Sequence, residues 1–289
     1  MPTIKNFASL VKISHTVFAM PFAFIGYFLA QQQAESFRWE LLLLVVLCMF
    51  FARNAAMSFN RYVDRLFDAA NPRTALREIP RGVVQPKHAL LFCLANALLF
   101  VATTFFINRL CLALSPVALA LVLGYSYAKR FTAWCHFILG LGLSIAPVGA
   151  YIAVSGAFAA PPMLLAALVL LWSGGFDIIY ALPDEEFDRQ QRLHSVPAAL
   201  GRKAALWLSA AVHLACFAII LYFGIYVINN AFYWTGAFIF AGCLVYQHKI
   251  LSINDISKVN IAFAAVNGVA SIIFAVFCIL GLKILYGVA

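Results

Sequence analysis

Charged residues are scarce in this chain. Asp, Glu, Lys and Arg make up 11% of its 289 residues, against roughly 25% in a typical soluble domain, and 64% of the residues are hydrophobic. The net charge of +9 comes from basic residues in short loops beside apolar runs, a pattern that orients membrane proteins and does not require nucleic-acid binding. The composition therefore predicts a membrane protein with many spans and little soluble mass.

The signatures of several other protein classes are missing. No Cys-x-x-Cys pair occurs among the seven cysteines, so we expect buried thiols and neither a disulfide framework nor a zinc site. The chain has no Gly-x-Ser-x-Gly, His-Glu-x-x-His or P-loop sequence, no low-complexity segment and no long linker. No clear Ala-x-Ala cleavage site ends the first apolar run, which we interpret as a retained helix. We expect a single domain over residues 1–289.

Nine apolar runs are long enough to cross a bilayer as helices, which takes about 20 residues. They cover residues 14–31, 40–60, 88–107, 110–128, 133–155, 162–182, 204–223, 231–250 and 262–286. If the N-terminus is inside, sixteen of the twenty Lys and Arg fall on the inner side, as the positive-inside rule expects. We therefore expect an all-α polytopic protein of nine transmembrane helices in a bacterial-type inner membrane, with its N-terminus and active-site loops facing the cytoplasm.

Acidic residues are rarer still, and they are concentrated. Seven of the eleven Asp and Glu fall in residues 60–68 and 177–188, at the inner ends of the second and sixth runs. Carboxylates are costly near a bilayer, so two such clusters indicate a functional site. An offset of 120 residues pairs Asn60 with Tyr180, Asp64 with Asp184 and Asp68 with Asp188. That repeat predicts a duplicated helical unit whose halves share a central cavity.

Both clusters have the spacing of metal ligands. Residues four apart lie on one helical face, so each cluster forms a ladder of oxygen atoms. The predicted ligands are Asn60, Asp64, Asp68, Asp184 and Asp188. Mg²⁺ binds one or two carboxylates together with substrate phosphates and several waters, so two facing ladders would hold Mg²⁺ against a diphosphate. Two ordinary solvated helix ends are the alternative, but they would leave the repeated spacing unexplained.

Basic and phenolic side chains accompany the acidic clusters. Arg73 and Arg77 lie four apart after the first cluster, and their guanidinium groups suit phosphate oxygens, although loop charge alone is the alternative. Tyr125 and Lys129 share a face at the inner end of the fourth run, where both would meet a leaving diphosphate. His194, beyond the second cluster, is a further candidate for phosphate contact.

Arg53 is unusual because it lies inside the second run, on nearly the same face as Asn60. A buried arginine needs an anion, and one beside a metal–diphosphate site would bind the carboxylate of an acidic substrate. The alternative is a structural pair with a buried carboxylate, but no acidic residue occurs in the deeper parts of the runs.

Together the motifs resemble those of the UbiA superfamily of intramembrane aromatic prenyltransferases. The shared motifs are N-x-x-x-D-x-x-x-D at 60–68, D-x-x-Y-x-x-x-D-x-x-x-D at 177–188, R-T-x-x-R at 73–77 and Y-x-x-x-K at 125–129. The resemblance covers nearly the whole chain. It implies two bundled helical halves around a central cavity that opens sideways to lipid.

The resemblance also implies roles for individual residues. It implies that the five oxygen ligands bind Mg²⁺ and the diphosphate of a polyprenyl donor, and that Arg53 meets an aromatic carboxylate. Tyr125 and Lys129 would assist departure of the diphosphate, Tyr180 would contact substrate, and Asp177 would help to activate the acceptor.

The implied reaction is Mg²⁺-dependent transfer of a polyprenyl group from its diphosphate to 4-hydroxybenzoate or a related quinone precursor, in ubiquinone or menaquinone biosynthesis. Where the family usually has Arg-Pro-Leu-Pro and Lys-Ser, this chain has Arg77-Glu78-Ile79-Pro80 and His194-Ser195. Those departures are more similar to a branch associated with futalosine-route menaquinone synthesis, so a naphthoate or a futalosine-pathway intermediate stays an alternative acceptor. The expected partners are polyprenyl diphosphate, an aromatic acid and membrane lipid, with no nucleic acid and no obligatory protein partner.

Two rival classes fit less well. CDP-alcohol phosphotransferases also use Asp ladders, but they concentrate them in one continuous motif, whereas 120 residues separate the two clusters here. A cation transporter would carry charges near the bilayer midplane in opposed helices. The acidic residues of this chain instead gather at one membrane face.

Overall fold

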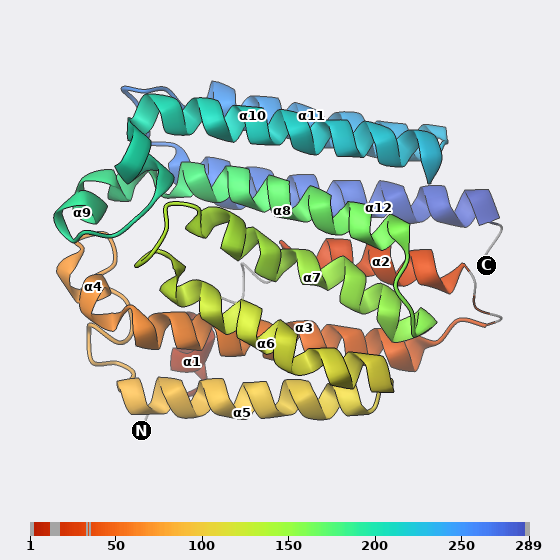
Figure 1. Cartoon of the computed structure of the whole chain (residues 1–289), viewed down its shortest axis with the longest axis horizontal. Coiled ribbons are helices and arrows are strands. Elements are labelled where there is room, and N and C mark those ends of the chain that lie inside the picture. The colour runs from red at the N-terminus through yellow and green to blue at the C-terminus, as the bar shows by residue number, and fades with distance from the viewer. Residues whose placement is uncertain (1–2, 12–17, 33, 35, 287–289) are drawn as a thin grey trace.

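A computed structural model describes residues 3–11, 18–32, 34 and 36–286, and no strand occurs among them (Figure 1). The helices are α1 (Ile4–Leu10), α2 (Met20–Gln31), α3 (Trp39–Val63), α4 (Arg65–Ala70), α5 (Pro86–Phe105), α6 (Arg109–Ala128), α7 (Cys135–Ser155), α8 (Ala160–Tyr180), α9 (Glu185–Gln190), α10 (Val196–Tyr226), α11 (Ala231–Lys249) and α12 (Asn267–Tyr286). A 3₁₀ turn (Leu182–Asp184) precedes α9, and a π-helical turn (Ile261–Val266) leads into α12.

Seven of these helical segments are long and apolar enough to cross a membrane. They are α3, α5, α6, α7, α8, α10 and the stretch Ile261–Leu285, which joins the π-helical turn to α12. The prediction of an all-α polytopic membrane protein is confirmed. The structure does not confirm the count of nine spans, because α2 has only 12 residues and α11, with Gln247 and His248 near its end, is less apolar. The predicted start of the first span falls within residues 12–17, outside the described residues.

Helix α10 begins at Val196, eight residues before the predicted start. The side chain of Ser195 accepts a hydrogen bond from the backbone N–H of Ala198, and Pro197 occupies the first turn, so both residues favour a helix start here. Gly201, with a left-handed φ of +80°, then kinks the helix before its apolar part. The sequence prediction missed this first turn because it counted only the apolar run.

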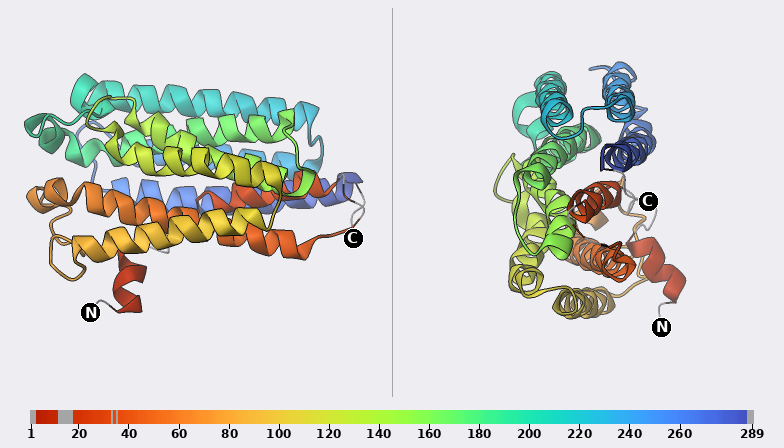
Figure 2. Two further views of the ribbon diagram at one scale, coloured as in Figure 1. Left: turned by 60° about the horizontal axis from the view of Figure 1, so that its bottom comes forward. Right: turned by 90° about the vertical axis from the view of Figure 1, so that its right-hand side faces the viewer.

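The long helices run side by side along the long axis of the molecule (Figures 1 and 2). The largest apolar core lies among α2, α8, α10, α11 and α12, around Trp172, Phe22, Phe240 and Phe274. A second core joins α2, α3 and α7, where Gly26 allows close approach: a Cβ there would lie 2.1 Å from the carbonyl oxygen of Pro147. The short helices α4 and α9 lie at the same end of the bundle, which brings the two acidic clusters together (Figure 1).

Candidate active site

Each acidic cluster begins on a long helix and ends on a short one. Helix α3 stops at Val63 because the backbone of Asp64 (φ −88°, ψ 5°) leaves the helical region, and α4 then begins. After α8, Pro183 lies in the 3₁₀ turn before α9, where its missing N–H prevents an unbroken helix. The four-residue spacing predicts that the ligand oxygens of each cluster share one continuous helical face. They do not, because the chain turns at Asp64 and again before Asp184.

A cavity of about 490 Å³ starts among the short helices and continues between α3, α6 and α7. Twelve of the thirteen site residues predicted from the sequence line it, namely Arg53, Asn60, Asp64, Asp68, Arg73, Arg77, Tyr125, Lys129, Asp177, Tyr180, Asp184 and Asp188. The charged residues of α4, α9 and the adjoining loops form what we term the charged end of the cavity. The deeper lining is apolar and includes Val45, Met49, Leu114, Val122, Leu143 and Ile152.

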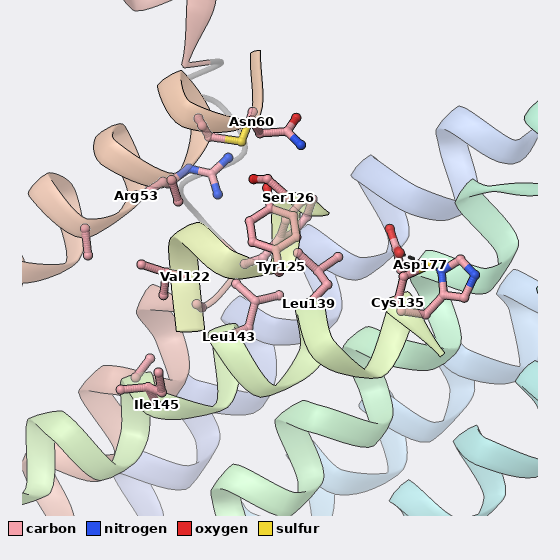
Figure 3. Close-up of a pocket in the computed structure, with 18 of the residues that line it drawn as sticks. Arg53, Asn60, Val122, Tyr125, Ser126, Cys135, Leu139, Leu143, Ile145 and Asp177 are labelled. Carbon is pink, nitrogen blue, oxygen red and sulfur yellow. Dashed lines mark hydrogen bonds and ion pairs between the residues drawn. The ribbon is translucent and has the colours of Figure 1, made fainter. Parts of the chain in front are cut away.

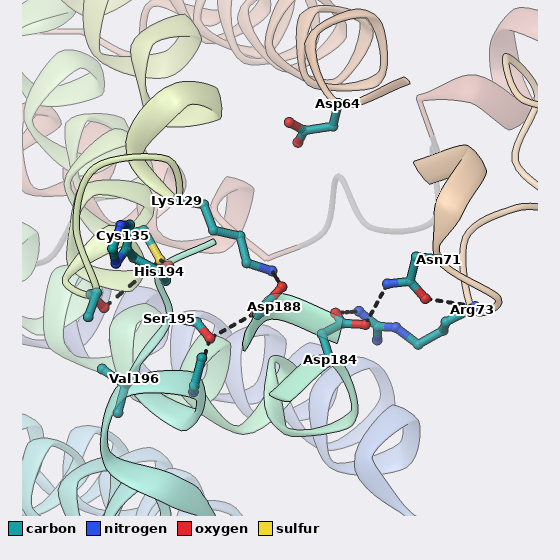
Figure 4. Close-up of polar contacts among 12 residues, drawn as sticks. Asp64, Asn71, Arg73, Lys129, Cys135, Asp184, Asp188, His194, Ser195 and Val196 are labelled. Carbon is teal, nitrogen blue, oxygen red and sulfur yellow. Dashed lines mark hydrogen bonds and ion pairs between the residues drawn. The ribbon is translucent and has the colours of Figure 1, made fainter. Parts of the chain in front are cut away.

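At the charged end each of the four predicted acidic ligands faces one basic side chain. The pairs are Asp64 with Arg130 at 3.5 Å, Asp68 with Arg77 at 2.7 Å, Asp184 with Arg73, and Asp188 with Lys129 at 2.7 Å. Asn71 also donates a hydrogen bond of 3.0 Å to Asp184 (Figure 4). Since Asn71 and Arg73 follow the first acidic cluster and Asp184 belongs to the second, these contacts tie the two halves of the sequence repeat together.

The donor set fits Mg²⁺ that arrives with a phosphorylated ligand. Across the described ranges no three His, Cys, Asp or Glu side chains are close enough together to form a metal cage. Mg²⁺ needs only one or two protein carboxylates when phosphates and waters complete its shell. Asp68 Oδ2 is buried and has no hydrogen-bond partner in the described residues, which leaves it available as a ligand atom.

Burial shifts the pKa of three groups at the charged end, Asp64, Asp188 and Lys129. Burial, assisted by the neighbouring Asp68, raises the pKa of Asp64 to about 6, although Arg130 opposes the shift. Burial also raises the pKa of Asp188, against the opposing effects of Lys129 and Ser195. Burial would lower the pKa of Lys129, but Asp188 outweighs it and the pKa of Lys129 is raised. The charged end therefore holds carboxylates whose ionised form needs a nearby positive charge.

Two arginines of α3 face the cavity without an anion. Arg53 makes no hydrogen bond or ion pair with any described residue, and its Nε is buried. Arg61, two turns further on, is 4% exposed, lines the cavity and is likewise unpaired within the described chain. The prediction that Arg53 lacks a structural carboxylate partner agrees with this arrangement. Figure 3 shows Arg53 beside Asn60 and Tyr125.

Tyr180 and His194 contribute differently from the other predicted residues. The ring of Tyr180 stacks on Phe263 with 4.0 Å between centroids, and the Arg73 guanidinium carbon lies over the Tyr180 ring, 4.8 Å from its centroid. His194 does not line the cavity: its side chain is exposed, and its backbone N–H donates to the carbonyl oxygen of Lys129 at 2.7 Å. Tyr180 thus helps to hold Arg73, whereas His194 lies outside the cavity lining, and its contact with phosphate stays a prediction.

Sequence reasoning missed four residues of the site. Arg61 and Arg130 were counted only as inner-side loop charge, and Asn71 and His136 were not singled out at all. Asn71 and Arg130 belong to the ion-pair system of the charged end, and His136 Nδ1 lies 2.7 Å from Asp177 Oδ2. The available signals were local: Arg61 directly follows Asn60, and Arg130 directly follows Lys129.

A scan against family models matches residues 19–272 to the UbiA prenyltransferase family. Among curated proteins, the chain is 32% identical over 164 residues to a 4-hydroxybenzoate octaprenyltransferase of Aliivibrio fischeri. That alignment covers 57% of this chain, and the chain spans only 57% of the length of the relative.

Solved structures match over a greater length. The apo structure of a UbiA homolog from Aeropyrum pernix K1 superposes with a TM-score of 0.84 and 31% identity, over 93% of this chain and 98% of that one. A UbiA homolog from Archaeoglobus fulgidus, solved with DMAPP and Mg²⁺ bound, has a TM-score of 0.68 and 18% identity, over 92% of this chain and 99% of that one. At that identity the second likeness supports the fold alone.

Proposed function

The chain belongs to the UbiA prenyltransferase family, and from that premise we propose that it transfers a polyprenyl group from a polyprenyl diphosphate to an aromatic acid. One observation carries the proposal: four acid–base pairs gather at one end of a cavity whose depth is apolar. A diphosphate with a hydrocarbon tail has the same division of polarity. The names of the relatives, which include 4-hydroxybenzoate octaprenyltransferases, support the same reaction.

The charged end would hold the diphosphate by exchanging partners. Asn60, Asp64, Asp68, Asp184 and Asp188 would bind Mg²⁺, which when bound would offset the negative charge that builds on the departing diphosphate. Arg73, Arg77 and Lys129 would turn from these carboxylates to phosphate oxygens, where charge-assisted hydrogen bonds are strong. In these three pairs each carboxylate and each cation would lose one partner and gain another.

The deeper cavity would hold the other parts of the substrates. Its apolar lining between α3, α6 and α7 would take up the first isoprene units, since apolar surface removed from water is stabilising at roughly 25 cal/mol per Å². Arg53, half-buried and without an acidic partner among the described residues, would bind the carboxylate of the aromatic acid. The acceptor would be 4-hydroxybenzoate or a related precursor in ubiquinone or menaquinone synthesis, with a naphthoate or a futalosine-pathway intermediate as the alternative.

The setting of the reaction follows from the charge bias of the loops. With the charged end on the side that carries sixteen of the twenty Lys and Arg, the active site would face the cytoplasm from a bacterial inner membrane. The whole chain would act as one domain, with lipid around it and no obligatory protein partner.

The test uses purified protein in lipid with Mg²⁺, a labelled polyprenyl diphosphate and 4-hydroxybenzoate. We expect prenylated product from the wild type and its loss in Asp64→Asn and in Asp184→Asn. Glu186→Gln is the matched control, because Glu186 is an exposed acid of α9 whose carboxylate accepts a hydrogen bond from Gln190 and pairs with no basic side chain among the described residues. Donor binding without product would indicate another aromatic acceptor, and a wild type that does not bind the donor would refute the proposal.

A further inference from the structure

His136 and Asp177 form a buried pair beside the charged end but outside its ion-pair system. His136 lies in the first turn of α7 and Asp177 in the last turn of α8, with His136 Nδ1 2.7 Å from Asp177 Oδ2. The imidazole is 2% exposed and the carboxylate 21% exposed, and both line the cavity. The histidine is therefore hidden behind an aspartate that reaches the open space.

A second contact determines which imidazole nitrogen carries the proton. The backbone N–H of Val196, the first residue of α10, lies 3.2 Å from His136 Nε2. The first N–H groups of a helix have no partner within it, and an N–H can only donate, so Nε2 must accept. The single proton of the neutral ring is then on Nδ1, from which it is donated to Asp177. A second proton on His136 would place an N–H at Nε2 that points at the N–H of Val196, and two donors cannot form a hydrogen bond with each other.

The other oxygen of Asp177 has a different environment. In the described parts of the chain, Asp177 Oδ1 receives no hydrogen bond, whereas Oδ2 receives the one from His136. Figure 3 shows Asp177 on the far side of Tyr125 from Arg53, and all three side chains line the cavity. An aromatic acid whose carboxylate is held by Arg53 would thus present its ring in the space toward Asp177.

We propose that His136 is a positioning residue that orients the Asp177 carboxylate as the proton acceptor for the aromatic ring. This inference rests on the proposed prenyl transfer. In that reaction the bond between the donor carbon and the diphosphate oxygen breaks, and its electron pair leaves with the diphosphate. A ring carbon of the acceptor then forms the new carbon–carbon bond. The proton lost by that ring carbon passes to Asp177 Oδ1, the ring regains its aromaticity, and the carboxylic acid later returns the proton to water.

Two substitutions of His136 separate this role from a structural one. In His136→Asn the side-chain NH₂ takes the place of Nδ1 and still donates to Asp177, but nothing reaches Val196. In His136→Gln the amide oxygen takes the place of Nε2 and still accepts from Val196, but Asp177 loses its donor. We expect kcat of the Asn variant within about threefold of wild type and kcat of the Gln variant lower by about tenfold or more, because general-base catalysis supplies roughly 10²–10⁴-fold. The KM for the donor should not change in either variant.

A structural role for His136 in anchoring α10 predicts the opposite order, with the Asn variant impaired and the Gln variant normal. That result would overturn the inference. An acceptor deuterated at the attacked ring carbon provides a second readout: the primary isotope effect on kcat should be larger in His136→Gln than in wild type, because proton loss becomes slow. Equal isotope effects in the two proteins would also overturn it.

Asp177→Asn keeps the inference testable if the His136 variants do not fold. It retains an oxygen that can accept from His136 but removes the basic carboxylate, so kcat should fall by about 100-fold while Mg²⁺-dependent donor binding persists. Unchanged kcat would refute the role of the pair. Absence of wild-type turnover would refute the proposed function. Wild-type turnover together with an unchanged kcat in His136→Asn, His136→Gln and Asp177→Asn would refute only the inference about His136.

Discussion

The pKa of Asp64 makes ligand binding at the charged end release protons. Burial and the neighbouring Asp68 raise that pKa to about 6, so about half of the Asp64 side chains carry a proton at pH 6 and about a tenth do so at pH 7. In the proposed site Asp64 binds Mg²⁺ as an ionised carboxylate, so metal binding would expel that proton. We therefore expect release of about 0.5 proton per site at pH 6 and about 0.1 at pH 7.

The measurement is titration calorimetry of Mg²⁺ with a polyprenyl diphosphate, without acceptor, in two buffers of different ionisation heat. Asp64→Asn is the matched control, because it removes the titrating carboxylate and leaves the protons released by the diphosphate itself. The sign is fixed by the direction of the shift: affinity should fall as the pH drops through 6, by about tenfold per unit below it. Equal proton release by wild type and Asp64→Asn at pH 6 would show that Asp64 does not bind the metal.

Three further outcomes follow from single positions. Arg53→Gln should raise the KM for the aromatic acid by about tenfold or more with little change in the KM for the donor, since Arg53 is a half-buried cation of the deeper cavity with no described anionic partner. The control Arg65→Gln should change neither KM, since the Arg65 guanidinium contacts the Tyr62 ring and carbonyl oxygen. Gly26→Ala should destabilise the protein by about 1–3 kcal/mol in a thermal unfolding assay, because the new Cβ would lie 2.1 Å from a carbonyl oxygen of α7; Gly149→Ala, at a site with open space, is its control. Asp64→Asn should raise the unfolding midpoint of the ligand-free protein at pH 8, because a raised carboxyl pKa means that the charged form destabilises the folded state. The difference in midpoint between Asp64→Asn and wild type should shrink as the pH falls from 6 towards 4, and a difference that instead grows would contradict the direction of the pKa shift.

The positions of the acidic clusters could be predicted from the sequence because they depend only on which residues are close together along the chain. Aspartates four residues apart at the ends of apolar runs are visible in the sequence, and so is their repetition after 120 residues. The bends at Asp64 and Pro183 were harder to predict, because a single turn of helix decides them and the four-residue spacing is compatible with a straight helix.

The contacts between distant segments could not be predicted. Asn71 reaches Asp184 only because α4 and α9 lie at the same end of the bundle, and His136 meets Asp177 only because α7 packs on α8. No spacing in the sequence encodes such a pair. The count of nine spans is not confirmed for a related reason: the described part of α2 is short, and polar residues lie near the end of α11.

The four acid–base pairs of the charged end make its occupancy depend on two ligands at once. A lone anion such as phosphate would compete for Arg73 or Lys129 but would leave a buried carboxylate without a counter-charge, which is costly. A lone divalent cation would bind the carboxylates and leave their arginine and lysine partners without a counter-charge. A ligand that brings an anion and a divalent cation together offers new partners to both the basic and the acidic side chains. Binding at the charged end therefore requires the cation and the anion at the same time. We therefore expect the charged end to bind free phosphate or free Mg²⁺ weakly and to bind the two together, as the proposed function requires.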